Sequence, residues 1–202
     1  MRLAALSRAD WRQVFTHPVL MGIVLVTAMS SAGQFTLFSY FAPYYSQVLG
    51  ASAAQISLLF LCFGAVGLVG NVLLTHTIDR IGAATAVALA LTCMAVSMLA
   101  WPLAVGVGSA LLVITPWALG CFSSNSAQQA RLALAAPALA TALISLTSSA
   151  MYLGQFAGAA SGGAMIATSG YAGLSWVALA WMSLALVTSL WAARRMRGGP
   201  HV

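Results

Sequence analysis

The sequence contains very little charge. Charged residues are 5% of its 202 residues, whereas they make up about a quarter of a soluble domain. No charged residue occurs between Arg12 and Asp79, between Arg80 and Arg131, or between Arg131 and Arg194. Runs of this length cannot be mainly hydrated, so the composition excludes an ordinary soluble domain and favours a protein that is embedded in a membrane.

Groups that could carry out catalysis or hold a metal are also scarce. Asp10, Asp79, His17 and His76 fall at the edges of apolar runs, and His201 is in the C-terminal tail. An enzyme needs titratable groups in a protected cleft, and none of these positions provides one. The three cysteines lie inside apolar runs, where cysteine behaves as a small apolar residue. We therefore expect no enzyme activity, no disulfide, no metal site and no cofactor.

Six apolar runs are long enough to cross a membrane, which takes about 20 residues of helix. We predict spans at about residues 18–45, 54–77, 83–101, 104–124, 137–163 and 171–193. The fold class is therefore all-α, with a six-helix transmembrane domain over residues 18–193. Residues 83–124 are twice as long as one span needs, so they must form a hairpin. Trp101-Pro102 marks its turn, because proline lacks the donor that a continuing helix requires.

The basic residues predict the orientation of these spans. Arginines precede the first span, separate spans two and three and spans four and five, and follow the sixth span. The connections around Gly50, Trp101 and Gly170 contain no basic residue. The positive-inside rule then places both termini, residues 1–17 and 194–202, in the cytoplasm, and the protein in the cell inner membrane.

The net charge of +6 fits this topology and an attraction to membrane lipid, and we expect no nucleic-acid binding, because the arginines form no continuous stripe. A cleaved signal peptide is the alternative for the first run. The run continues through Phe35, Phe38 and Phe41, which makes it too long for an ordinary signal-peptide core.

Glycine is concentrated in spans two and five. If the six spans are two triplets, these are the second members of each triplet, as in the 3+3 inverted repeat of secondary transporters. In span five, Gly154, Gly158 and Gly162 are four residues apart, so one helix face allows another backbone to come close. We interpret this face as a helix-packing surface, either fixed or sliding.

The turn after span two reads Ile78-Asp79-Arg80-Ile81-Gly82. Asp79 and Arg80 could bond to neighbouring backbone groups and to a partner helix, while Gly82 permits a tight turn. The alternative is a solvated loop that only marks the cytoplasmic side.

This turn, the six spans and the cytoplasmic arginines resemble the C-terminal half of a major facilitator superfamily transporter. Phe41-Ala-Pro43-Tyr44 and the glycines of residues 154–163 add to the resemblance, which is closest to the drug:proton antiporter branch with arabinose-efflux-like and purine-nucleoside-efflux-like permeases. It implies alternating access and a gating role for Asp79, Arg80 and Gly82. Because such transporters have about twelve spans, it also implies a homodimer, a second six-helix half, or a fragment of a longer permease.

Spans one, four and five carry the candidate binding residues for a small-molecule solute. Aromatic rings with amide groups at helical spacing suit a flat, partly polar solute. These residues are Gln34, Phe38, Phe41, Trp117, Asn125, Tyr152 and Gln155. Pro116 is expected to break or bend span four, which would free backbone groups beside a cavity.

Other aromatic residues are interpreted as contacts with lipid. Tyr44, Tyr45 and Trp101 fit an interfacial aromatic belt. Spans three and six are expected to face lipid because bulky apolar residues, including Trp176, Trp181 and Trp191, are spread over them.

The sequence thus predicts efflux of a small organic solute or drug. If the system is a proton antiporter, its buried acid must come from another half, because none lies within these spans. The alternative function is a non-transporting assembly or regulatory subunit, or an inactive fragment of a longer permease.

Overall fold

The computed structural model describes residues 8–198, and every element in that range is a helix. The α-helices are α1 (Arg8–Thr16), α2 (Pro18–Phe38), α3 (Phe41–Gln47), α4 (Ala53–Ile81), α5 (Ala83–Ala100), α6 (Val107–Ala135), α7 (Ala140–Ser169) and α8 (Leu174–Gly198). Short 3₁₀ helices connect some of them: η1 (Trp101–Leu103), η2 (Pro137–Leu139) and η3 (Gly170–Gly173). The prediction of an all-α fold is confirmed for the described chain.

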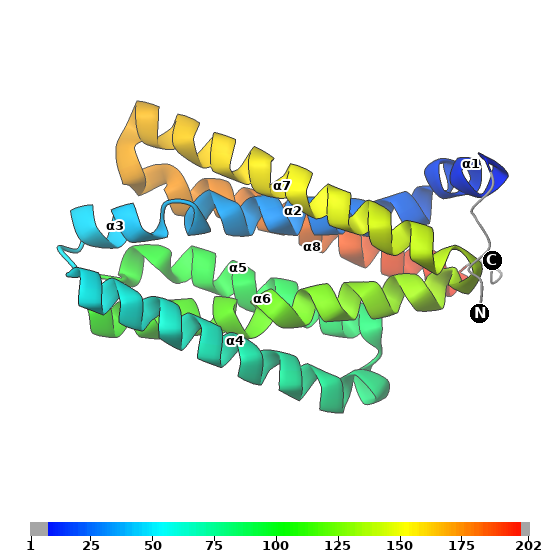
Figure 1. Cartoon of the computed structure of the whole chain (residues 1–202), viewed down its shortest axis with the longest axis horizontal. Coiled ribbons are helices and arrows are strands. Elements are labelled where there is room, and N and C mark those ends of the chain that lie inside the picture. The colour runs from blue at the N-terminus through cyan, green and yellow to red at the C-terminus, as the bar shows by residue number, and fades with distance from the viewer. Residues whose placement is uncertain (1–7, 199–202) are drawn as a thin grey trace.

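The long helices α2, α4, α5, α6, α7 and α8 run back and forth along one bundle (Figure 1). By length and composition the apolar stretches are Pro18–Gln47, Ala53–Ile81, Ala83–Leu103, Val107–Ala135 and Pro137–Met196. The last stretch is 60 residues long and contains both α7 and α8, which η3 separates. Gly50, Gly82 and Gly170 have positive φ angles of 63°, 79° and 67° at three of the turns, a conformation that favours glycine.

Local hydrogen bonds fix where some helices begin and end. Ser52 and Gln55 form a capping box at the start of α4, with the Ser52 N–H donating to Gln55 Oε1 at 2.8 Å. In return the Gln55 N–H donates to the Ser52 hydroxyl, so two otherwise free donors are satisfied. Gly82 ends α4, and its N–H donates to the Ile78 carbonyl at 2.8 Å.

The helices pack in a defined order. Helix α2 packs against α7 and α8, α6 packs against α4 and α5, and α5 packs against α8 to join the two groups. Helices α4 and α7 therefore form the flanks of the bundle on the side where α2 and α6 lie between them (Figure 1).

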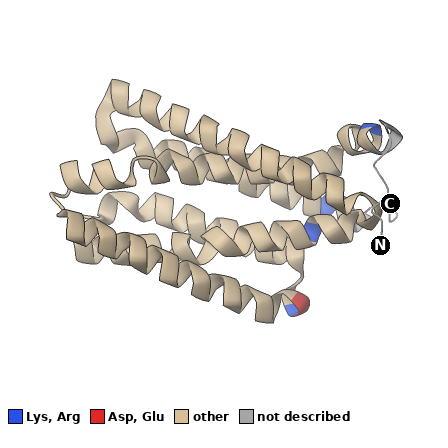
Figure 2. Ribbon diagram, in the orientation of Figure 1, with Lys and Arg blue, Asp and Glu red and all other residues tan. Residues whose placement is uncertain are grey.

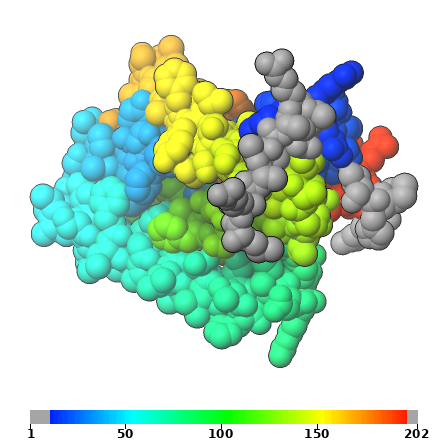
Figure 3. All heavy atoms as spheres, turned by 45° about the vertical axis from the view of Figure 1, so that its right-hand side comes forward, coloured from blue at the N-terminus to red at the C-terminus, as the bar shows by residue number. Residues whose placement is uncertain are grey.

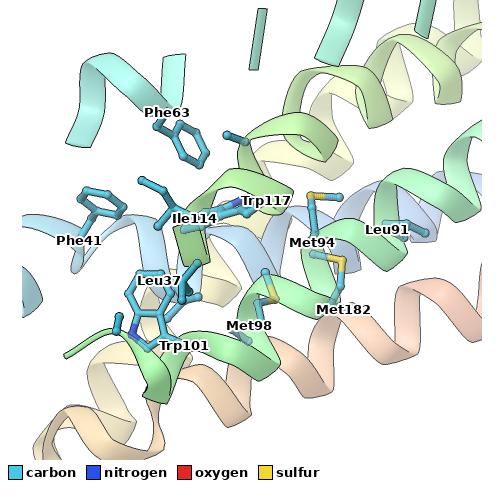
Figure 4. Packing of buried hydrophobic residues seen from close by; sticks show 14 of the residues in the cluster. Leu37, Phe41, Phe63, Leu91, Met94, Met98, Trp101, Ile114, Trp117 and Met182 are labelled. Atoms are coloured by element: carbon cyan, nitrogen blue, oxygen red, sulfur yellow. The ribbon is translucent and has the colours of Figure 1, made fainter. Parts of the chain in front are cut away.

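Aromatic and sulfur-containing side chains pack together in the core of the bundle (Figure 4). Tyr44, Tyr45 and Trp101 belong to this core, with exposed fractions of 7%, 0% and 2%. The prediction that they form an interfacial belt is wrong. The chain leaves the α-helix between Phe38 and Phe41, and a separate helix, α3, follows. Helix α3 directs the rings of Tyr44 and Tyr45 against Trp101 of η1, and the ring centroids of Tyr45 and Trp101 are 5.7 Å apart.

Helices α5 and α8 are also more buried than predicted. Met94 and Met98 of α5 and Met182 of α8 are almost completely buried, because these helices pack against each other and against α6 and α2. Trp176 remains 54% exposed. Only the outer faces of α5 and α8 are therefore available to lipid.

Helix α6 continues through Pro116 without a break. The hydroxyl of Ser97 in α5 accepts the Trp117 N–H at 2.7 Å and donates to the Val113 carbonyl at 2.6 Å. In a regular helix Trp117 and Val113 would bond directly. A side chain of the neighbouring helix thus bridges two backbone groups beside the proline. The helix does not break at Pro116, and a bend there stays a prediction.

Charged residues within the described chain lie at the end of the bundle that contains both termini (Figure 2). The opposite end, with the turns at Gly50, η1 and η3, carries none (Figure 2). The long helices therefore connect one charged end with one uncharged end.

Candidate functional site

A cavity of about 380 Å³ lies among α2, α4, α6 and α7. In Figure 3 α6 is visible at the bottom of a hollow between α7 and α4. The cavity is lined by Ser31, Gln34, Phe35, Phe38, Phe60, Phe63, Gly64, Trp117, Cys121, Phe122, Asn125, Met151 and Gln155.

Five candidate binding residues from the sequence line this cavity: Gln34, Phe38, Trp117, Asn125 and Gln155. They come from three helices that are far apart in the sequence. The spacing within α2 and α6 places these residues on the faces that meet at the cavity. Their role in binding a solute remains a prediction.

Two candidates lie elsewhere. Phe41 is completely buried because it begins α3, and its ring centroid is 4.5 Å from that of Tyr45. Tyr152 is 64% exposed on another face of α7. Phe41 therefore contributes to the core behind the cavity, while Tyr152 points away from it.

The wall contributed by α4 was not predicted from the sequence. Phe60, Phe63 and Gly64 line the cavity, although only the glycines of this helix were singled out as a feature. The spacing of Phe60 and Phe63 beside a glycine was a usable signal, because residues three and four apart share a helix face.

Aromatic rings form a continuous cavity wall. The Phe63 and Trp117 rings are 5.0 Å apart and nearly perpendicular, at 75°. The centroid of the Phe38 ring lies 5.8 Å from that of Phe60 and 6.2 Å from that of Trp117, and both contacts are edge-to-face. Such contacts hold rings in fixed orientations, so the wall offers a preformed surface to a flat apolar solute.

Amide groups supply the polar part of the cavity. The indole N–H of Trp117 donates to Gln34 Oε1 at 3.3 Å. The side chains of Asn125 and Gln155 make no hydrogen bond with another described residue. No lining residue is charged, so the site is suited to a neutral solute.

The three glycines of the predicted packing face lie directly against α2. A methyl group on Gly154, Gly158 or Gly162 would meet the carbonyl oxygen of Ala28, Ala32 or Thr36, respectively. Thr36 Oγ1 also donates to the Gly158 carbonyl at 3.2 Å, and the Tyr40 hydroxyl donates to the Ala159 carbonyl at 2.8 Å. These bonds favour a fixed α2–α7 contact over a sliding one.

Asp79 and Arg80 are exposed at the end of α4. Neither side chain makes a hydrogen bond or ion pair with another residue in the described part of the chain. Gly82, with its positive φ, forms the turn that follows. A gating role for this turn therefore needs a partner outside the described residues.

Arg131 is the polar residue that the sequence analysis misplaced. It was taken as the marker of a cytoplasmic connection, but it lies inside α6 with an exposed fraction of 2%. Its guanidinium donates to the hydroxyl and carbonyl of Ser189 in α8. Residues 125–135 contain neither glycine nor proline, which was a signal that span four continues beyond residue 124.

Within residues 8–198 there is no group of three or more histidine, cysteine or acidic side chains that could hold a metal. The cavity lining consists of aromatic rings, three amides, the Ser31 hydroxyl, the Cys121 thiol, the Met151 thioether and Gly64.

No family model matches the sequence. The chain is 26% identical over 176 residues to YbcL of Bacillus subtilis (strain 168), which is described as an uncharacterized MFS-type transporter. The match covers 85% of this chain and 44% of YbcL, so the chain spans about half the length of that curated relative.

This similarity and the bundle of apolar helices support membership of the major facilitator superfamily of membrane transporters. Its apolar helices are long enough for a multi-pass membrane protein, and the relative it resembles is described as a transporter.

Proposed function

We propose that this chain forms one half of a major-facilitator transporter that exports a small, flat, partly polar organic solute by alternating access. The observation that carries the proposal is the uncharged cavity, which combines an aromatic wall with three amide side chains from separate helices. Clefts of a few hundred Å³ with mostly apolar walls and a few polar groups are the usual form of small-molecule sites.

The packing order supports an inverted repeat of two triplets, α2–α4–α5 and α6–α7–α8. In such a repeat α2 corresponds to α6, α4 to α7, and α5 to α8. The contacts of α2 with α7 and α8 then correspond to the contacts of α6 with α4 and α5, and both sets are present. The glycine contacts follow the same exchange: glycines of α7 approach the α2 backbone, and Gly67 and Gly70 of α4 approach the α6 backbone at Ala118 and Leu119. Solute sites of such transporters lie at the repeat interface. The cavity is lined by α2 and α4 of one triplet and α6 and α7 of the other, which supports the proposal.

A second six-helix half, from a second copy of the chain or from another polypeptide, would complete the pathway. The flanks beside the cavity carry exposed apolar side chains that such a half could cover. They include Leu61, Leu68, Val69 and Leu73 of α4 and Leu153 and Phe156 of α7. The similarity to less than half of a longer transporter supports the same arrangement.

The energy source belongs to the other half in this proposal. A proton-coupled carrier commonly uses a buried acid, and no acidic residue lines the described cavity. The chain lies in the cell inner membrane in this proposal. Its arginine-bearing end, with both chain termini, faces the cytoplasm under the positive-inside rule.

The test is transport by the purified protein. Its mass in detergent is determined first, and the same sample is reconstituted into liposomes loaded with coumarin as a neutral, flat, fluorescent probe. We expect efflux above that of protein-free liposomes loaded with the same probe, and a several-fold slower efflux for Gln34→Ala. Thr92→Ala is the matched control, because the Thr92 hydroxyl only bonds to the Ala88 carbonyl of its own helix on an exposed face.

The rival function is a non-transporting assembly or regulatory subunit, which the exposed apolar face of α4 also fits. A monodisperse six-helix monomer that shows no efflux of the probe would favour this rival. Efflux that is identical in the wild type and Gln34→Ala would remove Gln34 from the proposed binding site.

A further inference from the structure

The contact between Trp117 and Gln34 fixes the direction of an amide in the cavity wall. An indole N–H can only donate, whereas an amide side chain has one accepting and one donating end. Because Trp117 Nε1 lies 3.3 Å from Gln34 Oε1, the amide oxygen is turned towards the indole and the NH₂ end is turned away from it.

Trp117 is itself held in place. Its side chain is 1% exposed, its backbone N–H donates to the Ser97 hydroxyl at 2.7 Å, and its ring packs against Phe63 and Trp101. Turning the indole would disturb the ring contacts with Phe63 and Trp101, so the N–H stays directed at Gln34.

The free end of the Gln34 amide faces the cavity. Its Nε2 group makes no hydrogen bond with a described residue, and it is absent from the fully buried polar atoms that lack a partner in the described chain. Gln34 as a residue is only 7% exposed, and it lines the cavity. The accessible NH₂ group is therefore a donor that a bound solute would cover.

A covered donor needs an acceptor. If a solute without an acceptor displaced water from this NH₂ group, the donor would lose its hydrogen bonds without replacement. An ionised solute would lose its hydration in a cavity with no charged partner. We propose that the cavity selects neutral aromatic solutes with a hydrogen-bond acceptor, and that Trp117 is the positioning residue that sets this preference through Gln34.

This inference rests on the proposed role of the cavity as the solute site, but it can be tested without transport. The probes are quinoline, which has an acceptor nitrogen, naphthalene, which has the same shape without it, and indole, which has a donor. Binding is measured in alkaline buffer, where quinoline is neutral, on purified protein in detergent. The readout is protection of Cys121, a cavity residue, from alkylation in a Cys62→Ala/Cys93→Ala background.

In this background protein we expect quinoline to bind about tenfold more tightly than naphthalene, the size of effect expected for one unsatisfied buried donor. Trp117→Phe keeps a ring but removes the N–H, so the amide can turn. A turning amide can accept from indole as well as donate to quinoline, so indole should gain affinity and the preference for quinoline over indole should fall towards one. Gln34→Leu should abolish the preference for quinoline over naphthalene.

Trp181→Phe is the matched control. Trp181 Nε1 donates to the Ser161 hydroxyl at 3.3 Å, which is the same kind of bond outside the cavity lining. This variant should keep the tenfold preference. A preference for quinoline over indole that persists in Trp117→Phe would overturn the inference, as would a preference for quinoline over naphthalene that is undiminished in Gln34→Leu. A lack of Cys121 protection by every probe would also overturn it.

The two proposals fail separately. Selective binding without efflux from liposomes would leave the inference standing and contradict transport. Efflux with no preference for acceptor-bearing probes would contradict the inference and leave transport standing.

Discussion

Arg131 donates two hydrogen bonds to one residue, Ser189: Nη1 to the hydroxyl at 2.9 Å and Nη2 to the backbone carbonyl at 3.0 Å. The side chains belong to α6 and α8, and both residues are buried. No acidic side chain bonds to Arg131 among the described residues. Neutral oxygens from one partner therefore compensate for part of the lost hydration, and the pair joins α6 to α8.

The first prediction concerns this pair. Ser189→Ala removes the acceptor of Nη1, and we expect a loss of about 1.5–3 kcal/mol of stability, the usual value for hydrogen bonds to charged groups. The measurement is unfolding in detergent followed by tryptophan fluorescence. Ser145→Ala, which removes an exposed hydroxyl bonded only to its own helix, should change stability little. Equal stability of both variants would show that the Arg131 bond contributes nothing.

The uncharged runs were sufficient to predict the helices, because a long apolar segment has few alternatives to a helix in lipid. They were not sufficient to place Arg131. A charge in such a sequence normally marks the end of a span, and its partner Ser189 is 58 residues away. Only the folded bundle, which brings Ser189 of α8 to Arg131 of α6, shows that this charge is buried.

The parts of the candidate site that come from residues spaced along a single helix could be predicted from the sequence. The spacing of Gln34 and Phe38 and of Trp117 and Asn125 matches their positions on the cavity wall. Phe41 follows the same spacing, but the break between α2 and α3 removes it from that face. Such a break depends on tertiary contacts around the aromatic core, and periodicity alone does not reveal it.

The second prediction concerns the bridge at Pro116. Ser97→Ala leaves the Trp117 N–H and the Val113 carbonyl without the hydroxyl that joins them, at a cost of about 1–3 kcal/mol for an unsatisfied buried group. Pro116→Ala on the same background allows the direct helical bond to form. We therefore expect the second change to recover stability, measured by a double-mutant cycle of unfolding. Additive effects would mean that Ser97 does not compensate for the proline.

The third prediction concerns the glycines of α7. The Cβ of Gly158→Ala would meet the Ala32 carbonyl, whose backbone cannot easily move, and we expect a loss of about 1–3 kcal/mol from overpacking. Gly64→Ala in α4 has nothing within 4 Å of the added methyl group, and it should gain up to about 1 kcal/mol from helix propensity. Thermal unfolding in detergent distinguishes the signs, and a stabilising Gly158→Ala would contradict the close α2–α7 contact.

The fourth prediction tests orientation. Val105→Cys lies at the uncharged end with an exposed fraction of 83% for the native residue, and Ile81→Cys lies beside Arg80 with 38%. With the three native cysteines replaced by alanine, a membrane-impermeant maleimide should label Val105→Cys in intact cells. Ile81→Cys should react only after permeabilisation, because the arginine-bearing end is expected in the cytoplasm. Labelling of Ile81→Cys in sealed cells would reverse the orientation, and labelling of both in sealed cells would contradict the six-pass topology.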